Sequence, residues 1–567
     1  MKETMEILFG LFGGLAVFIF GMNMMSECLQ KAAGEKMKKI LSLLTKNPIM
    51  GVVAGALTTA VLQSSSATTV MAIGFVSAGL MSLPQAISII LGANIGTTMT
   101  AQIIAFKISD YIYVFIFAGF LVSFIARSQK VKNIGQTVFA FGLLFLGIET
   151  MGDVMKPLAS SPFFTDMIGK VANIPILGVA VGTLMTLVVQ SSSATIAVLQ
   201  NFASQAGADG VTSIIGLAGA IPILLGDNIG TTITAVLASV GQSKDAKRTA
   251  VAHCIFNISG CLIFIWFVKP YASLIQMISP KGPEVEVISR QIANAHTGFN
   301  LVMTLIWIPL IWLMVKIVMK IIPEGKSKYV LDPSAPQYLD EKLIEQPVAA
   351  LHLVSKEVIR CSEIVGEMLT LMKDADVREE IAVLQQIIEK ADIEHSLYDS
   401  INDYLAAMFS EGVLTEEQAG QATGIIYVLC DIDRIGMLCR DIAENVINQN
   451  GKKQKYSKDA VKDLNKSLGV ILDMYQDVMK VIVNGETVDM KELQKNKEVV
   501  MRLDEKMRKA HMDRVGKGKC EVKLTAPFNA LLHDIDRMGN SCANLADTTA
   551  QNVDFYAFLE ETVEPQA

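Results

Sequence analysis

The stretch between Asn47 and Phe106 contains no aspartate, glutamate, lysine or arginine, yet it is rich in hydroxyl and amide side chains. Apolar runs of this length can span a bilayer. In hydrocarbon, every backbone polar group must find a partner within the protein, so such a segment folds as helices, and irregular backbone survives only where protein or a cavity surrounds it. The sequence therefore predicts a helical membrane domain with an unusually polar interior.

Charge divides the chain into two unlike halves. Residues 1–330 carry 22 Lys and Arg against 14 Asp and Glu (+8), and residues 331–567 carry 27 against 42 (−15), which together give the −7 of the whole chain. The second half is polar and has the pattern of amphipathic helices. We expect an all-α protein with a membrane domain over 1–325, a linker over 326–340 and a soluble helical-bundle domain over 341–555. The acidic second half argues against nucleic-acid binding.

Three motifs occur twice in the membrane half, in the same order. The pairs are FIFGMNMM (18–25) with LFLGIETM (144–151), QSSSAT (63–68) with QSSSAT (190–195), and LGANIGTTMTA (91–101) with LGDNIGTTITA (225–235). Their nearly constant spacing indicates an internal duplication. We expect one repeat over about 8–127, a second over about 134–268 and an extra span over 296–322.

The basic clusters set the predicted topology. Clusters of Lys and Arg at 31–46, 127–132, 244–248 and 316–328 all lie in the cytoplasm if the positive-inside rule holds. The number of crossings between clusters must then be even, so 48–80 and 175–206 are expected to enter and return as re-entrant hairpins with QSSSAT at their tips. Spans are expected at 7–25, 84–107, 111–126, 135–155, 212–240, 249–268 and 296–322, with a short external loop at 270–295. An odd number of crossings per repeat makes the copies inverted, which is typical of secondary transporters.

The repeated motifs offer hydroxyls and amides but no lysine or arginine. We expect Gly92 and Gly96, on either side of Asn94, to break their span and expose free N–H groups that suit an anion and free carbonyls that suit a small cation. Without Lys or Arg, an oxyanion held there needs a co-bound cation, for which Na⁺ is the natural candidate. Binding of each ligand then favours binding of the other.

Asp227 stands in the second GxNIGTT motif where the first has Ala93. Acids inside a membrane are costly and usually functional, so Asp227 is expected to be a cation ligand or a proton site. The competing interpretation of any single Ser or Thr is a bond back to its own helix. For His253 and His296, in AHCIFN and AHTGFN, it is a buried histidine with satisfied hydrogen bonds. No GxSxG elbow accompanies the serines, so we expect neither an enzyme nor a resident cofactor.

The paired QSSSAT and GxNIGTT motifs, with AHTGFN, resemble the bacterial sodium/phosphate cotransporters, relatives of the type II transporters, over roughly residues 8–322. The resemblance implies that the QSSS segments lie on opposed re-entrant hairpins and contact phosphate and Na⁺. It implies phosphate binding by Gln63, Ser64, Ser65, Ser66, Gln190, Ser191, Ser192 and Ser193. The supporting candidates for Na⁺ binding, beside Asp227, are Thr68, Asn94, Thr97, Thr195, Asn228 and Thr231.

The acidic half also contains a repeat, CDIDRIGMLCRDIAENV (430–446) and HDIDRMGNSCANLADTT (533–549). It resembles a PhoU domain, which implies two three-helix bundles. The family pattern is close to ERIGDxxxNIAE, and here Asp433 replaces the Glu while Met437 and Asn540 replace the following Asp. Solvated helix faces with Asp–Arg pairs explain these acids as well as a metal site does, so no metal ligand is assigned. The domain could be a regulator, a dimerisation surface or a sensor of phosphate status.

These features predict a Na⁺-coupled symporter of inorganic phosphate in the bacterial inner (plasma) membrane. It would be multi-pass, with a cytoplasmic PhoU-like domain that meets an unidentified regulator, and with a homodimer as an option. One alternative is a symporter of the same build for another small oxyanion, or one driven by protons through Asp227. An alternative of another class is a membrane-anchored phosphate sensor. The direction of net flux and the number of Na⁺ ions stay open.

Overall fold

A computed structural model describes residues 2–41, 47–106, 108, 111–159, 170–171, 173–207, 209–323, 332–375, 380–412, 414–452, 454–484 and 490–552. These residues form helices, with one isolated β-bridge between Ala206 and Ser213, so the predicted all-α fold is confirmed. The chain separates into two compact units, Met1–Lys326 and Ser327–Ala567. Residues 326–331 of the predicted linker and 553–555 of the predicted second domain lie outside the described residues.

Six helical segments within the described ranges are long and apolar enough to cross a membrane, which confirms the prediction of a polytopic membrane protein. They are Met5–Lys31, Leu83–Ile104, Gln129–Met155, Gly216–Ser239, Lys244–Ile278 and Glu284–Ile321. The crossing expected at 111–126 corresponds to a shorter apolar helix, Ile112–Ile125. The two segments around QSSSAT are pairs of short helices, and their re-entry into the membrane stays a prediction.

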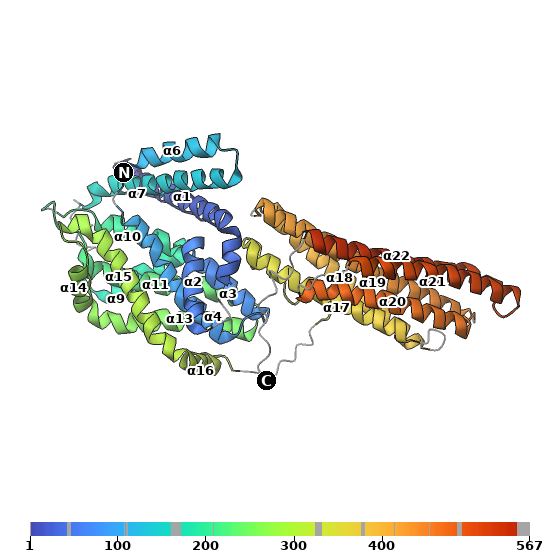
Figure 1. Ribbon diagram of the computed structural model, residues 1–567. Helices are drawn as coiled ribbons and strands as arrows, with labels where there is room; N and C mark the ends of the chain where they lie inside the picture. Colours follow the sequence, from blue (N-terminus) through green and yellow to red (C-terminus); the bar gives the residue numbers. More distant parts are fainter. Residues whose placement is uncertain are drawn as a thin grey trace. The chain divides into compact units, whose positions relative to one another are not determined.

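The helices of the first unit follow the two repeats (Figure 1). The first repeat contains α1 (Lys2–Leu41), α2 (Pro48–Leu62), α3 (Ser65–Ser77), α4 (Leu83–Gly96), α5 (Thr98–Ile104) and α6 (Ile112–Ile125). The second contains α7 (Gln129–Ala159), α9 (Pro175–Val189), α10 (Ser192–Ala203), α11 (Gly216–Gly230) and α12 (Thr232–Ser239). Then come α13 (Lys244–Phe264), α14 (Val268–Ile278), α15 (Glu284–Trp307) and α16 (Ile311–Ile321). Equivalent helices pack alike, since α2 lies on α4 and α9 lies on α11, while α1 and α6 lie along α7.

The glycines of the GxNIGTT motifs bring helices together, and the expectation that they break their span is wrong. Only Thr97 separates α4 from α5, and it keeps helical dihedrals (φ −62°, ψ −24°) and donates its N–H to the Ala93 carbonyl at 3.0 Å. A Cβ on Gly92 would overlap the Val52 carbonyl oxygen of α2. Close approach of two helix backbones through small residues is a common way to pack membrane helices, and it explains these glycines without a break.

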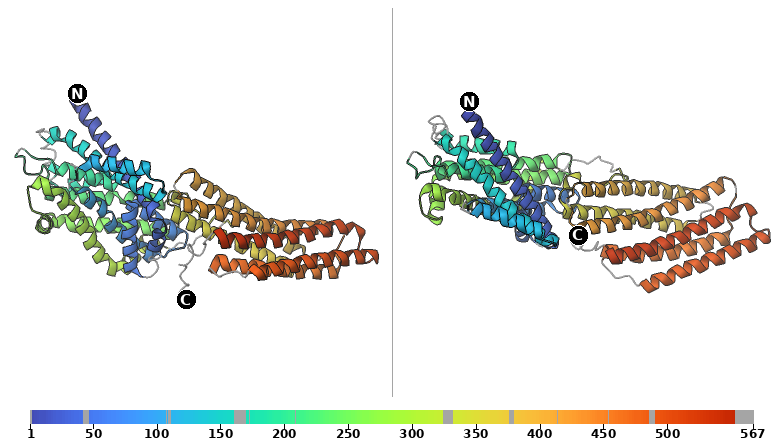
Figure 2. Two further views of the ribbon diagram at one scale, coloured as in Figure 1. Left: turned by 45° about the horizontal axis from the view of Figure 1, so that its top comes forward. Right: turned by 90° about the horizontal axis from the view of Figure 1, so that it is seen from above.

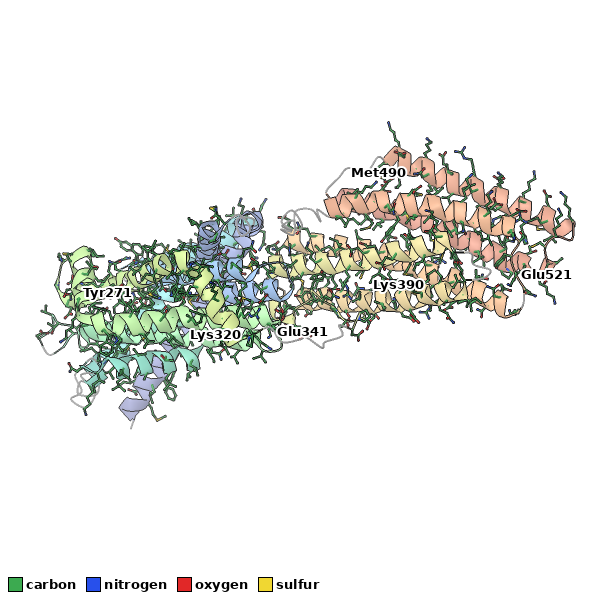
Figure 3. The ribbon with its side chains drawn as sticks, turned by 90° about the horizontal axis from the view of Figure 1, so that it is seen from below. Tyr271, Lys320, Glu341, Lys390, Met490 and Glu521 are labelled. Carbon is green, nitrogen blue, oxygen red and sulfur yellow. The ribbon has the colours of Figure 1, made fainter. Side chains whose placement is uncertain are left out.

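The prediction of a loop at 270–295 is also wrong, because most of these residues are helical. Helix α14 covers its first part, and α15 begins at Glu284. Tyr271, Ala272 and Ile275 are buried on one face of α14, a spacing that a helix satisfies. Tyr271, labelled in Figure 3, donates its hydroxyl to the Ala295 carbonyl of α15 at 2.6 Å. This short helix therefore packs against the start of AHTGFN.

In the part of the second unit that the structure describes, six α-helices form a bundle in two groups of three. They are α17 (Pro347–Asp374), α18 (Ile381–Ser410), α19 (Glu416–Gly451), α20 (Lys458–Asn484), α21 (Met490–Gly516) and α22 (Thr525–Asn552). Each group packs within itself, and the groups meet where α19 lies on α22 and α17 on α20, as the views of Figure 2 show. Part of the predicted linker belongs to this bundle, since buried Glu357 accepts hydrogen bonds from the N–H groups of Gln337 and Tyr338.

Candidate functional site

Each QSSSAT motif is a sharp hinge between two helices. Gln63 (φ 51°) and Gln190 (φ 54°) are the non-glycine residues with positive φ in the described part of the chain. A left-handed residue other than glycine costs about 1–3 kcal/mol, and such strain gathers at functional sites. Here it occurs twice at equivalent positions. We call residues 63–66 the first hinge and residues 190–193 the second hinge.

A serine after each glutamine begins the next helix. The Ser64 hydroxyl accepts from the Ala67 N–H at 3.1 Å, and the Ser191 hydroxyl accepts from the Ala194 N–H at 3.2 Å. Serine is a preferred N-cap because it satisfies one of the free N–H groups of the first turn. The other N–H groups at the starts of α3 and α10 have no partner within their helices. A helix N-terminus of this kind attracts anions, and hydroxyls surround both of these.

The first hinge is tied to helices of both repeats. Ser65 donates to the Thr97 hydroxyl at 3.4 Å, and Thr100 donates to the Gln63 side-chain oxygen at 3.0 Å. Ser66 accepts from Thr234 of α12 at 3.1 Å, which links the first hinge to the second repeat. The structure thus brings together two of the candidate residues, Ser65 and Thr97, that lie far apart in sequence.

A pair of threonines braces each hinge. The hydroxyls of Thr59 and Thr68 are 2.8 Å apart, and those of Thr186 and Thr195 are 3.0 Å apart. In the second repeat the Thr186 hydroxyl also donates to Asp227 Oδ1 at 2.6 Å. A chain of hydroxyls therefore leads from the second hinge to the carboxylate, and the first repeat has no equivalent because Ala93 stands in that place.

Asp227 is fully buried, and its Oδ2 has no hydrogen-bond partner among the described residues. The side chains of Asn94 and Asn228 both donate to the carbonyl one turn earlier, of Ile90 and Leu224. Thr231 bonds the Asp227 carbonyl in the same way. These polar groups of α4 and α11 therefore bond within their own helices.

The two AHxxFN histidines, His253 and His296, are buried but do not have all the hydrogen bonds that the sequence led us to expect. His296 Nε2 lies 3.3 Å from the Asn228 side-chain oxygen. The Nδ1 atoms of His253 and His296 are buried without a partner in the described chain, so the interpretation of two satisfied histidines is wrong. The repetition of AHxxFN was the available signal, and the histidine–asparagine contact needs the packing of α15 on α11.

The second hinge is more open than the first. Gln63 is buried and hydrogen-bonded, whereas Gln190 is exposed. Within the described residues, the side chains of Gln190, Ser192 and Ser193 make no hydrogen bonds. Their donors and acceptors are therefore available to a ligand.

The acids of the second unit are spread over its helices. Asp433 accepts from His395 Nδ1 at 2.7 Å. Its counterpart Asp536 lines a surface pocket with Glu498, Asp504 and Glu505. Neither here nor in the membrane unit do the described residues place three or more His, Cys, Asp or Glu close enough to hold a metal ion.

Comparison with known proteins assigns both units. The Na⁺/Pi-cotransporter family model matches twice, over residues 17–153 and 150–280. The PhoU domain model matches residues 358–446. No solved structure matches the chain.

Three relatives illustrate the range of similarity. The uncharacterized protein YqeW of Bacillus subtilis is 33% identical over 54% of this chain and 95% of its own length. The putative inorganic phosphate export protein YjbB of Salmonella typhimurium is 24% identical over 97% of this chain and 98% of its own length. The sodium-dependent phosphate transport protein 2A of Rattus norvegicus is 38% identical over 16% of this chain and 15% of its own length. With its duplicated membrane unit and its PhoU domain, the chain belongs to the Na⁺/Pi-cotransporter family.

Proposed function

We propose that the protein is a Na⁺-coupled symporter of inorganic phosphate. Residues 1–325 would transport, and the PhoU-like domain over 341–555 would regulate from the cytoplasm, with 326–340 as the connection. The observation that carries the proposal is the pair of hinges, each of which presents a helix N-terminus and a run of serines without lysine or arginine. Such a site suits an oxyanion that arrives with its own cations.

Phosphate would bind at the first turns of α3 and α10. The proposed ligands are Gln63, Ser64, Ser65 and Ser66 of the first hinge and Gln190, Ser191, Ser192 and Ser193 of the second. Hydroxyls and backbone N–H groups can both donate to phosphate oxygens. The side chains of Ser192 and Ser193 support this role, because they make no hydrogen bond within the described residues that phosphate would have to replace.

Sodium would bind beside the hinges, where oxygen atoms are concentrated. The proposed residues are Thr68, Asn94, Thr97, Thr195, Asp227, Asn228 and Thr231. The free Oδ2 of Asp227 supports a cation, because a buried carboxylate oxygen without a donor is costly. Na⁺ beside the anion would supply the positive charge that the hinges lack, which couples the two ions.

The unequal hinges support alternating access. In an inverted duplication, one half can be closed while its equivalent is open, and exchange of the two forms moves a central site from one side to the other. The buried Gln63 and the exposed Gln190 fit two such forms. We therefore place the hinges on opposed re-entrant hairpins of an inner-membrane protein.

The relatives' names support a phosphate substrate. One names export, and another names sodium-dependent transport without a direction. A coupled carrier runs either way according to its gradients, so net flux follows the Na⁺ and phosphate gradients of the cell. Neither name bears on the number of Na⁺ ions.

The test is uptake of radiolabelled phosphate into proteoliposomes of the purified protein, with an inward gradient of Na⁺ or of K⁺ at equal ionic strength. We expect uptake with Na⁺ only. Uptake driven equally by a proton gradient without Na⁺ would favour proton coupling, and flux of arsenate or sulfate in place of phosphate would favour another oxyanion. No flux of any anion by correctly inserted protein would contradict a transporter and favour the sensor.

A further inference from the structure

Helices α13 and α15 correspond to each other in motif and in packing, although α15 lies outside the two predicted repeats. Each carries an AHxxFN motif, at 252–257 and at 295–300. Helix α13 packs on α3 and α12, and α15 packs on the equivalent α10 and α5. Each also packs on both GxNIGTT helices, α4 and α11. The two motifs therefore hold corresponding places next to the two halves of the proposed site.

The asparagine of each motif has a fixed orientation. Asn257 donates its Nδ2 to the His253 carbonyl, and Asn300 donates its Nδ2 to the His296 carbonyl, both at 3.1 Å. A flipped amide would set oxygen against oxygen, so Oδ1 must be the atom that points away. Both asparagines are fully buried, and both Oδ1 atoms lack a partner among the described residues.

An unpartnered buried amide oxygen destabilises the folded protein, and here this occurs twice at equivalent positions. The flanking Phe256 and Phe299 are fully buried, so apolar surface increases the need for a partner. In both motifs the unpartnered atom is the asparagine Oδ1, and in both the asparagine Nδ2 bonds the histidine carbonyl. Each oxygen is therefore built to meet a ligand.

The partner of these oxygens must be a cation or a hydrogen donor. His296 adds a second acceptor on the same helix face, one turn away. Asn228 uses its Nδ2 on Leu224, so its oxygen accepts from His296, which places the proton on Nε2 and leaves a lone pair on Nδ1.

The whole interior has a surplus of acceptors. In the described membrane unit, the buried side-chain atoms without a partner include six acceptor atoms, on Gln200, Asp227, Asn257, Gln291, His296 and Asn300. Two threonine hydroxyls, of Thr58 and Thr69, are the atoms of this set that can donate. A water molecule can donate to two of these acceptors at most, whereas a cation can be coordinated by more oxygen atoms at once and needs no donor.

We propose that Asn257 Oδ1 and Asn300 Oδ1 are Na⁺ ligands, one on α13 and one on α15. The inference rests on the proposed function and extends it, because it adds ligands from α13 and α15 to those expected on the repeats. Helix α15 already reaches the repeat-two residues through the contact of His296 with Asn228.

The experiment measures thermal unfolding of the purified full-length protein in detergent, without phosphate, as NaCl replaces KCl at constant ionic strength. Na⁺ that binds the folded protein raises Tm. We expect Asn257→Ala and Asn300→Ala each to raise the Na⁺ concentration for half the Tm shift by fivefold or more. Asn300→Asp, which keeps an oxygen there, should restore the response.

Asn294→Ala is the matched control. Asn294 lies on α15, the helix of Asn300. Its amide is satisfied, since the oxygen accepts from Gln102 and the nitrogen donates to Ser279. We expect it to keep the Na⁺ response of the unchanged protein. If an alanine variant does not fold, Asn257→Ser and Asn300→Ser replace it, since serine keeps a shorter oxygen ligand and should weaken the Na⁺ response.

Two failures are distinguishable. If the unchanged protein shows no Na⁺-dependent phosphate uptake, the proposed function fails. If it shows such uptake, and folded variants at Asn257 and Asn300 keep the normal Na⁺ response, the oxygens bind water only and the inference is overturned.

Discussion

The two hinges share their geometry and differ in their surroundings. Gln63 and Gln190 have nearly the same left-handed φ, each is followed by a serine N-cap, and a threonine pair braces each. The glutamine of the first hinge is buried, whereas that of the second is exposed. Within the described chain, the second hinge alone is linked through Thr186 to a carboxylate, that of Asp227. In the proposed site, the shared features would hold the ligand, and the differences would set access and charge.

The difference in closure comes from packing and not from the hinge sequence. Helix α1 packs on α2, and seven residues of α2 are buried. Its counterpart α9 buries only Gly178, Gly182 and Thr186 among its residues. Since the two QSSSAT motifs are identical, the neighbouring helices must determine which hinge is open.

The largest effect should come from the glycines that both repeats share. Gly92→Val and Gly226→Val would each drive a side chain into the carbonyl oxygen of the facing helix, Val52 or Val179. We expect either change to destabilise the protein by about 3 kcal/mol or more, or to prevent folding. Gly13→Val on α1 is the control, because a Cβ there meets no atom within 4 Å. Thermal unfolding in detergent measures all three, and near-normal stability of Gly226→Val would contradict the close packing of α9 on α11.

Asp227→Asn tests the asymmetry in charge. The amide can still accept from Thr186 but lacks the negative charge, so the Na⁺ concentration for half-maximal phosphate uptake should rise about tenfold. The double variant Ala93→Asp with Asp227→Ala would move the acid to the first repeat. If that variant transports normally, the two halves are interchangeable and the comparison breaks down.

The PhoU-like unit allows the same comparison between its own repeats. Glu394 of α18 is fully buried with both carboxylate oxygens unpartnered among the described residues. It faces Gly436, whereas the apolar Val500 faces the equivalent Gly539. Burial, with a smaller effect of the Asp433 charge, raises the pKa of Glu394 from 4.5 to about 9. The folded unit therefore holds a proton that the unfolded chain releases, and stability falls as the pH rises from about 4.5 to about 9.

Glu394→Gln mimics the protonated acid and removes this dependence. We expect it to raise the free energy of unfolding of the PhoU-like unit at pH 8 by about 1–3 kcal/mol and to leave it nearly unchanged at pH 4.5. Denaturant titrations at the two pH values check this. Equal effects at both would mean that Glu394 is ionised in the folded protein.

The smallest expected effects concern the threonine pairs. Thr68→Val removes one hydroxyl contact, at a cost of about 1 kcal/mol of stability. Both variants should weaken Na⁺-dependent uptake, and Thr195→Val should weaken it more, because Thr195 is joined through Thr186 to Asp227. Identical uptake kinetics in the two variants would remove this distinction between the repeats.

Sequence reasoning succeeded where a short motif determines its own geometry. The duplication, the all-helical fold and the turns at QSSSAT follow from patterns within a few residues. The role of Gly92 depends on the helix that packs against it, so its local pattern wrongly predicted a break in the span. The helix at 268–278 likewise depends on its packing against α15, so its local pattern wrongly predicted a loop. The histidine–asparagine pairs were visible as repeats, but their free oxygens appear only once the neighbouring helices exclude every donor.

The central claim is that the two hinges form one phosphate site. Its most direct test introduces Ser65→Cys and Ser192→Cys, separately, into a variant whose native cysteines are replaced, and measures the rate of modification by a small thiol reagent. We predict that phosphate with Na⁺ slows modification at both positions, and that phosphate with K⁺ slows neither. Protection at one position alone, or at neither, would contradict a shared site.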